Sequence, residues 1–168
     1  MPENAGTMRR TGAPRCRGSH GRSPLAILRG MPGIDLLRLR DALEASWDPD
    51  TSYGRAVRLG NPAYGQCYPT ARVVQRYFPE TEVAEGEVWT GHEVEKHFWN
   101  VLDHGGTLFH VDLSWQQFPL GSSVRAYVVR DRSTFADSPE TIRRVEILLH
   151  RVAAQLQADI ETNPSSER

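Results

Sequence analysis

Three residues of this sequence are of the types that cooperate in thiol catalysis, namely Cys67, His97 and Asp112. A cysteine is a strong nucleophile as its thiolate, which a neighbouring imidazolium favours. A histidine can take up the thiol proton, and a carboxylate can hold the imidazole in one orientation. We therefore predict that Cys67 is a nucleophile, with His97 as its base and Asp112 as the group that orients the base.

Cys67 is predicted to begin a helix. Pro69 fits the first turn, where its missing amide proton is not needed, and the apolar residues that follow end at Pro79. The free amides and positive end of a helix N-terminus favour a thiolate, and Gly65 allows a tight turn beside it. The amide of Cys67, together with the side chain of Gln66 or a neighbouring amide, could hold the oxyanion of a tetrahedral intermediate.

His97 and Asp112 fall on two runs with strand character, residues 97–102 and 107–115, joined by Asp103-His104-Gly105-Gly106. This linker is typical of a hairpin turn. If its four residues form the loop, His97 lies directly opposite Asp112 on the same face of the hairpin, close enough for a hydrogen bond. A one-residue slip would place the two side chains on opposite faces. Both faces are largely apolar, so we expect each to be covered.

Five more residues are candidates for oxyanion or substrate binding: Gln66, Trp99, Asn100, Trp115 and Gln117. The two tryptophans could wall an acyl-binding cleft, although large aromatic side chains are more often part of a core. Asn100 and Gln117 could orient the site or a substrate amide, and structural hydrogen bonding is an equally ordinary role for them.

Simpler interpretations exist for the same residues. A single cysteine in a globular domain is usually a small buried hydrophobic residue. Four histidines, His92, His97, His104 and His110, could join Cys67 in a zinc-binding structural module, but the sequence has no CxxC or HxxxH pair. We therefore expect no metal ion and no organic cofactor.

The elements that must position these residues indicate an α+β domain. Apolar residues three and four apart predict helices over residues 34–47 and 138–160, the latter beginning at Ser138 and Pro139. Residues 83–89 and 124–129 have strand character. We expect an N-terminal helix, a Cys-bearing helix packed on an antiparallel sheet of three to five strands, and a C-terminal helix that closes the core.

The length of 168 residues fits one domain, which we place at residues 31–160, followed by a frayed C-terminus at 161–168. Residues 1–30 contain six arginines and no continuous apolar segment, which indicates a disordered tail, with an Arg-rich transit peptide as the alternative. Met31 opens the segment that looks folded, so residues 1–30 could also lie upstream of the natural start.

The net charge and the number of cysteines limit which partners and which cellular compartment we expect for this protein. A net charge of -1 gives no basic excess, so neither nucleic acid nor a membrane surface is expected as a partner. No apolar run approaches the roughly 18 residues that would span a bilayer. One of the two cysteines, Cys16, falls in the tail, so a structural disulfide with Cys67 is not expected and a reduced, cytoplasmic protein fits best. The oligomeric state is left open.

The order of these motifs resembles a known superfamily. Cys67 at a helix start, then His97-Phe98-Trp99-Asn100, then Asp112-Leu113-Ser114 resemble the transglutaminase-like branch of the papain-like fold, in which Cys, His and Asp arrive in that order. Gly65-Gln66-Cys67 and the segment 112–118 more narrowly resemble a small bacterial family of YunG-like proteins, over roughly residues 34–155. The superfamily resemblance implies thiol chemistry on amides or related acyl groups. The YunG-like resemblance names no substrate.

Together these observations predict a thiol-dependent amide hydrolase, peptidase or acyltransferase that uses a Cys-His-Asp triad and an acyl-enzyme. Its substrate would be an amide- or acyl-bearing molecule such as a peptide or protein. The alternative is a catalytically silent papain-like domain that binds a peptide or protein partner in the same groove.

Overall fold

The computed structural model describes residues 34–162, with side chains as far as residue 159. The predicted tail, Cys16 and most of the predicted frayed C-terminus lie outside this range. Helices and strands follow in the order α1 (Leu36–Glu44), α2 (Cys67–Tyr77), β1 (Glu82–Trp89), β2 (Val94–His104), β3 (Thr107–Val111), β4 (Ser123–Arg130) and α3 (Pro139–Thr162). Single turns of 3-10 helix lie between them: η2 (Tyr53–Arg55), η3 (Trp115–Gln117) and η4 (Arg132–Thr134).

All three predicted helices are confirmed. Side chains cap the starts of α1 and α3, the latter at Ser138 as predicted. The carboxylate of Asp35 accepts a hydrogen bond from the amide of Arg38 (2.8 Å), and the hydroxyl of Ser138 accepts one from the amide of Thr141 (3.2 Å). Each of these bonds satisfies an amide that lacks a partner within its helix. Helix α2 begins at Cys67, as predicted.

The four strands form one antiparallel sheet in the order β3-β2-β1-β4. The predicted strand positions are confirmed, but two boundaries differ. Strand β2 begins at Val94, three residues before the predicted start at His97, because residues 94–96 pair with the end of β1. Strand β3 ends at Val111, so residues 112–115 leave the sheet instead of continuing the strand.

The predicted hairpin register is wrong by two residues. His104 pairs with Thr107 and Leu102 with Phe109, so only Gly105 and Gly106 form the turn between the strands. Both glycines have positive φ angles, as a two-residue hairpin turn requires. Continued along the hairpin, this register places Trp99 opposite Asp112. Because a shift of two residues keeps every side chain on its face, His97 and Asp112 remain on the same side of the hairpin as diagonal neighbours.

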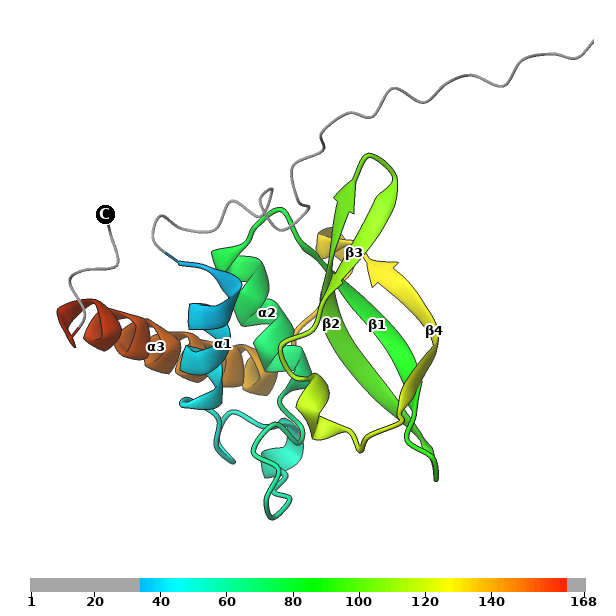
Figure 1. Ribbon diagram of the computed structural model, residues 1–168, viewed down its shortest axis with the longest axis horizontal. Coiled ribbons are helices and arrows are strands. Elements are labelled where there is room, and N and C mark those ends of the chain that lie inside the picture. Colours follow the sequence, from blue (N-terminus) through cyan, green and yellow to red (C-terminus); the bar gives the residue numbers. More distant parts are fainter. Residues whose placement is uncertain (1–33, 163–168) are drawn as a thin grey trace, which may run out of the picture.

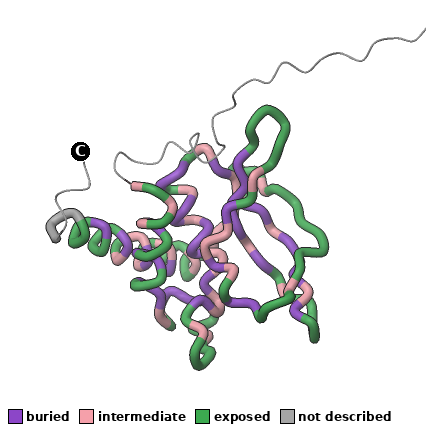
Figure 2. Tube along the Cα trace, in the orientation of Figure 1, coloured by how far each residue is buried: buried purple, intermediate pink, exposed green. Residues whose placement is uncertain are grey.

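The three helices lie on one side of the curled sheet, with α2 between the sheet and the other two helices (Figure 1). The main hydrophobic core fills the space between the helices and the sheet face that carries Val111. A second, smaller cluster of Ala84, Trp99 and Val101 lies on the opposite face, the one that also carries His97. The tip of the β2–β3 hairpin and most of β4 are exposed (Figure 2). The prediction that both faces of the hairpin are covered is therefore correct only near the base of the hairpin.

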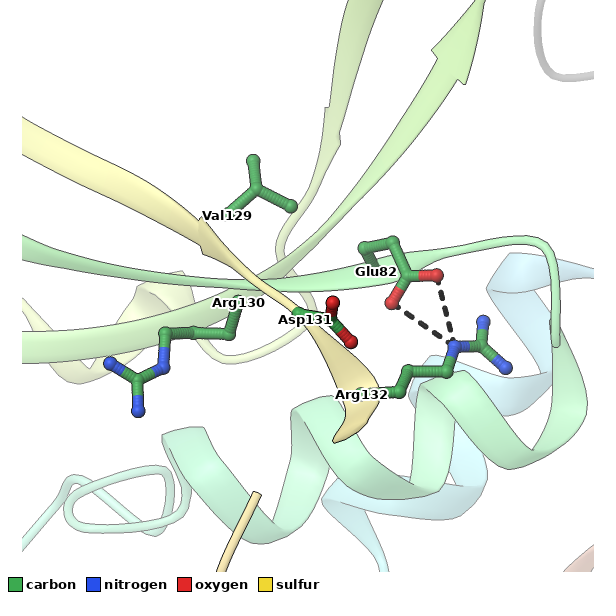
Figure 3. A pocket seen from close by; sticks show the side chains of 5 residues that line it. All are labelled: Glu82, Val129, Arg130, Asp131 and Arg132. Atoms are coloured by element: carbon green, nitrogen blue, oxygen red, sulfur yellow. Dashed lines mark hydrogen bonds and ion pairs between the residues drawn. The ribbon is translucent and has the colours of Figure 1, made fainter. Parts of the chain in front are cut away.

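Arg132 connects the end of β4 to the start of β1 beside a surface cavity of about 430 Å³ (Figure 3). Its Nε donates to both carboxylate oxygens of Glu82 (2.9 and 3.1 Å), and its terminal nitrogen donates to the carbonyl oxygen of Thr81 (2.8 Å). The guanidinium of Arg132 and the carboxylate of Glu82 are therefore paired with each other, which gives these two side chains a structural role.

Candidate functional site

The imidazole of His97 lies in contact with the carboxylate of Asp112. Its Nε2 is 2.6 Å from Oδ2 of Asp112, and the ring is fully buried in the middle of β2. A charge-assisted hydrogen bond of this length is strong, and in a buried position it is poorly screened by water. The contact that we predicted is therefore present, although it is diagonal and not directly across the hairpin.

Asp112 is held in place by the turn that follows β3. Its second oxygen, Oδ1, accepts hydrogen bonds from the amide (3.0 Å) and the hydroxyl (3.1 Å) of Ser114, a buried residue. With both oxygens engaged, the carboxylate has a fixed orientation toward His97. The sequence signal for Ser114 was available, because Asp-x-Ser is typical of a turn in which the Asp side chain bonds the chain two residues on.

Cys67 approaches the same imidazole from the start of α2. It is a free, partly exposed cysteine, and it lies close enough to His97 to contribute to the raised pKa of the imidazole. The preceding residue, Gln66, makes no side-chain cap to the helix, which leaves the first-turn amides beside the sulfur. Gly65 precedes it with a φ of 74°, a conformation that favours glycine.

The pKa of His97 is raised from its ordinary value of 6.5 to about 9. Burial of the ring on its own lowers the pKa, because it disfavours the charged form. The hydrogen bond to Asp112 and the charge of its carboxylate, with a further contribution from Cys67, outweigh burial and raise the pKa of His97. The site therefore favours an imidazolium at neutral pH, placed between a carboxylate and a sulfur.

Aromatic rings surround the imidazole. Trp99 stacks on it, with ring centroids 5.5 Å apart and planes inclined by 21°. Phe118 and Trp115 meet it edge-on, with centroids at 4.8 and 5.9 Å. Aromatic faces stabilise a cation and the rings exclude water, so both effects support a buried imidazolium. Phe118 was not among the predicted site residues.

Gln117 contacts the other nitrogen of the imidazole. Its Nε2 is 2.9 Å from Nδ1 of His97, and its side chain is buried. Its backbone carbonyl accepts a hydrogen bond from Nδ2 of Asn61 (2.7 Å), which ties η3 to the loop before α2. The structure thus brings the predicted Gln117 into the site.

Comparison with known proteins shows the family to which the chain belongs. The model of the YunG protein family matches residues 35–157, which is most of the chain. The chain belongs to the YunG protein family. The match contains Cys67, His97, Asp112 and Gln117, and it covers all four strands. A search of curated proteins found no match, and neither did a search of solved structures.

Two predicted site residues of this YunG family member lie outside the site. The side chain of Gln66 points away from Cys67, because its Nε2 donates to the carbonyl of Asp48 (2.8 Å) and it lines a different cavity. Asn100 lies on the opposite face of β2, where its Nδ2 donates to the carbonyl of Ala71 (3.0 Å) and to Oγ1 of Thr81 (3.3 Å). Gln66 and Asn100 therefore hold the fold together around the site.

A cavity of about 580 Å³ opens at Cys67. Gly65 and Gln117 lie in its wall, and Glu95 and Lys96 bring charges of both signs to it. The rest of the wall is mostly aromatic: Tyr53, Tyr64, Tyr68 and Phe98. Trp99 and Trp115 are not among the residues that line it, so their contact is with His97 and not with this cleft. The YunG family member therefore presents its cysteine in a groove large enough for a short chain segment.

Within residues 34–162, no three His, Cys, Asp or Glu side chains come together in a group suited to hold a metal ion. None of the helices in this range combines the length and the apolar character needed to cross a bilayer.

Proposed function

We propose that this protein is a thiol-dependent amide hydrolase or acyltransferase with a Cys67–His97–Asp112 triad on a papain-like, transglutaminase-like core. One observation carries the proposal: a fully buried His97 contacts Asp112 through one nitrogen, and Asp112 and Cys67 both raise the pKa of its imidazole. A buried imidazolium needs compensation, and the carboxylate and the sulfur supply it together. A thiol with such a partner in an open groove is the arrangement that activates a cysteine nucleophile.

In the proposed reaction, the thiolate of Cys67 attacks an amide carbonyl. A carbon–sulfur bond forms, and the carbonyl π electrons move to oxygen to give a tetrahedral oxyanion. His97 then transfers its Nδ1 proton to the leaving nitrogen as the carbon–nitrogen bond breaks, which leaves an acyl-enzyme. Water or an amine attacks the acyl group, His97 takes up the proton of that nucleophile, and the thiolate departs.

The cleft supports an extended acyl substrate such as a peptide or a protein side-chain amide. Its aromatic walls offer apolar contact, while Glu95 and Lys96 offer charges at the rim. Hydrolysis, deamidation and acyl transfer share the first half of this mechanism and differ only in the leaving amine and the second nucleophile. We place the protein in the cytoplasm, where a cysteine nucleophile stays reduced.

The test uses p-nitrophenyl acetate as a small acyl donor. We expect a burst of p-nitrophenol and an acetyl adduct on Cys67 in peptide mass spectrometry, and we expect Cys67→Ala to lose both while remaining folded. Cys16→Ala is the matched control and should keep the burst. If wild-type protein forms no adduct on Cys67, or if Cys67→Ala retains the burst, the enzymatic proposal fails and a silent binding domain becomes the better account.

A further inference from the structure

A second cavity, of about 320 Å³, lies beside the cleft at Cys67, between the starts of α2 and α3. We call it the α3 cavity. Tyr53, Tyr68 and Phe98 line both this cavity and the cleft, and the α3 cavity is completed by Pro69, Ala136, Asp137, Ser138, Thr141 and Arg144. Because the two cavities share three aromatic rings, a substrate that reacts at Cys67 can extend past these rings into the α3 cavity.

One residue of the α3 cavity is a buried cation. Arg144 is 6% exposed, and an arginine is almost never buried to this extent unless it is fully paired. Its Nη1 donates to Oε1 of Glu140 (2.7 Å), and its Nη2 donates to Oγ1 of Thr141 (3.0 Å). Its Nε has no hydrogen-bond partner among the residues that the structure describes. Because the side chain of Glu140 is 66% exposed and its charge is screened by water, the positive charge of Arg144 is only partly compensated.

The carboxylate that lines the α3 cavity does not supply the missing compensation. One oxygen of Asp137 accepts a hydrogen bond from the hydroxyl of Tyr68, and the other forms an ion pair with the guanidinium of Arg72. Both oxygens are therefore committed within the protein. Since residues of the first turn of α3 line the cavity, the positive end of the helix dipole lies beside it as well. The α3 cavity is therefore suited to an anionic group of a ligand.

We propose that the α3 cavity is a subsite for a carboxylate of the substrate, which pairs with Arg144; the proposal rests on the thiol function above and narrows its substrates to acidic molecules. The reactive carbonyl lies at the sulfur of Cys67, and an apolar part of the substrate lies on the rings of Tyr68 and Phe98. A guanidinium and a carboxylate match in their planar geometry, and a charge-assisted pair of this kind is strong. The ring of Tyr53 lies over Arg144, with its centroid 5.6 Å from Cζ, and Tyr53 is 73% exposed. Displacement of this exposed ring by the substrate uncovers the guanidinium.

Lys96, a cation of the cleft itself, is a weaker partner for such a carboxylate. Its Nζ is 2.6 Å from Oε1 of Glu85, and its side chain is 67% exposed. An exposed cation that already has a partner gains little from a second carboxylate. Because Lys96 lines the cleft and Arg144 lines the α3 cavity, variants at these two positions report on different subsites.

The experiment measures how fast Cys67 is alkylated by N-bromoacetyl ω-amino acids of increasing chain length. In this reaction the sulfur–carbon bond forms as bromide leaves with the bonding electron pair, so no acyl-enzyme is needed. Each acid is compared with its own primary amide, which has the same length and no charge. At the chain length that fits, we expect wild-type protein to react about 10- to 100-fold faster with the acid, the usual contribution of a hydrogen bond to a charged group.

Arg144→Met should abolish this preference for the acid. Its rate of alkylation by iodoacetamide should stay within about threefold of wild type, because the thiolate is stabilised by His97. Arg143→Met is the matched control, since it removes one positive charge from an exposed position on the same helix and should keep the preference. Glu140→Gln should raise the preference, because it frees Nη1 of Arg144 from a competing carboxylate.

An acidic side chain and the C-terminus of a peptide offer the same carboxylate group. Bromoacetyl-Ala-Glu-amide presents the first, and bromoacetyl-Ala-Ala with a free C-terminus presents the second. The label that reacts faster in wild-type protein, relative to bromoacetyl-Ala-Ala-amide, and loses this advantage in Arg144→Met identifies the source.

Equal rates for acid and amide at every chain length in wild-type protein would overturn the proposal. A preference that Arg144→Met keeps and Lys96→Met loses would overturn it too, because the carboxylate would then bind in the cleft. If Arg144→Met does not fold, Glu140→Gln decides, since an unchanged or smaller preference in that variant contradicts the proposal. Failure of the thiol function is distinct, because wild-type protein would then form no acetyl adduct with p-nitrophenyl acetate, whereas alkylation would still report on the subsite.

Discussion

At the scale of single residues, the site is organised around one buried imidazole. Each nitrogen of His97 has a polar neighbour, and three aromatic rings enclose the rest of the ring. The contact between His97 and Asp112 could be predicted because residue types, the turn signal and strand alternation together placed both side chains on one face of the hairpin. The side-chain direction of Gln66 could not be predicted, because it depends on a carbonyl in the loop before α2.

The raised pKa of His97 predicts how stability depends on pH. A group whose pKa is about 9 in the folded protein and near 6.5 in the unfolded chain stabilises the fold fully below about pH 6.5. That contribution is lost as the pH rises through 9. In urea titrations from pH 6 to pH 10, the free energy of unfolding should therefore fall by a few kcal/mol more in wild type than in Asp112→Asn.

The matched control for this titration is Asp103→Asn, which removes a carboxylate from the same hairpin. Asp103 accepts a hydrogen bond from the amide of Gly106 in the exposed turn and has no contact with His97. The free energy of unfolding of Asp103→Asn should therefore depend on pH as that of the wild type does. Parallel curves for wild type and Asp112→Asn would mean that the carboxylate does not support an imidazolium.

At the scale of elements, the sheet positions His97 and Trp99, and Gly86 on the neighbouring strand leaves space for the Trp99 ring. Gly86 pairs with His97 across β1 and β2, and it lies under the ring of Trp99. A Cβ there would come within 2.5 Å of the carbonyl oxygen of Ala126 and 2.6 Å of the Trp99 ring. Gly86→Ala should cost about 1–3 kcal/mol of stability, measured by chemical denaturation.

The same substitution should also slow alkylation of Cys67, because displacement of Trp99 removes the ring that stacks on His97. Trp99→Phe shortens the ring but leaves the backbone carbonyl of Ala126 in place, so the double variant should remain destabilised. Full recovery in Gly86→Ala/Trp99→Phe would contradict this account of the crowding.

A change at Asn100 should lower stability without affecting the reactivity of Cys67, because Asn100 holds β2 to α2 and lies outside the site. Asn100→Ala should reduce stability by about 1–3 kcal/mol, because buried acceptors on Ala71 and Thr81 lose their donor. Its rate of Cys67 alkylation at 10 °C, well below the unfolding transition, should match wild type. A large change in that rate would place Asn100 in the site after all.

The hairpin shows which part of an element can be predicted. The alternation of side chains fixed the face of His97 and Asp112, and the Asp-His-Gly-Gly segment correctly indicated a turn. The number of residues in the turn was wrong because both Gly-Gly and the longer Asp-to-Gly segment are acceptable loops. The pairing of β1 with β4 depends on contacts far apart in the sequence, which local patterns do not encode.

At the scale of the whole molecule, α3 closes the core on which the site rests. Leu148 and Val152 are fully buried against the other helices. Leu148→Ala should cost about 2–5 kcal/mol. If the domain unfolds as one unit, the fast alkylation of native Cys67 should be lost in the same transition that changes tryptophan fluorescence. Ile142→Ala on the same helix is the control, because that side chain is 45% exposed and should cost little.

The central claim is that Cys67 is held as a reactive thiolate by His97 and Asp112, and the rate of its alkylation by iodoacetamide at pH 6 tests this most directly. An ordinary thiol with a pKa near 8.5 is less than about 1% ionised at that pH. We expect Cys67, identified by peptide mass spectrometry, to react at least about tenfold faster in the native protein than in the urea-unfolded chain, and His97→Ala to remove the difference. A native rate equal to or below the unfolded rate would contradict the account.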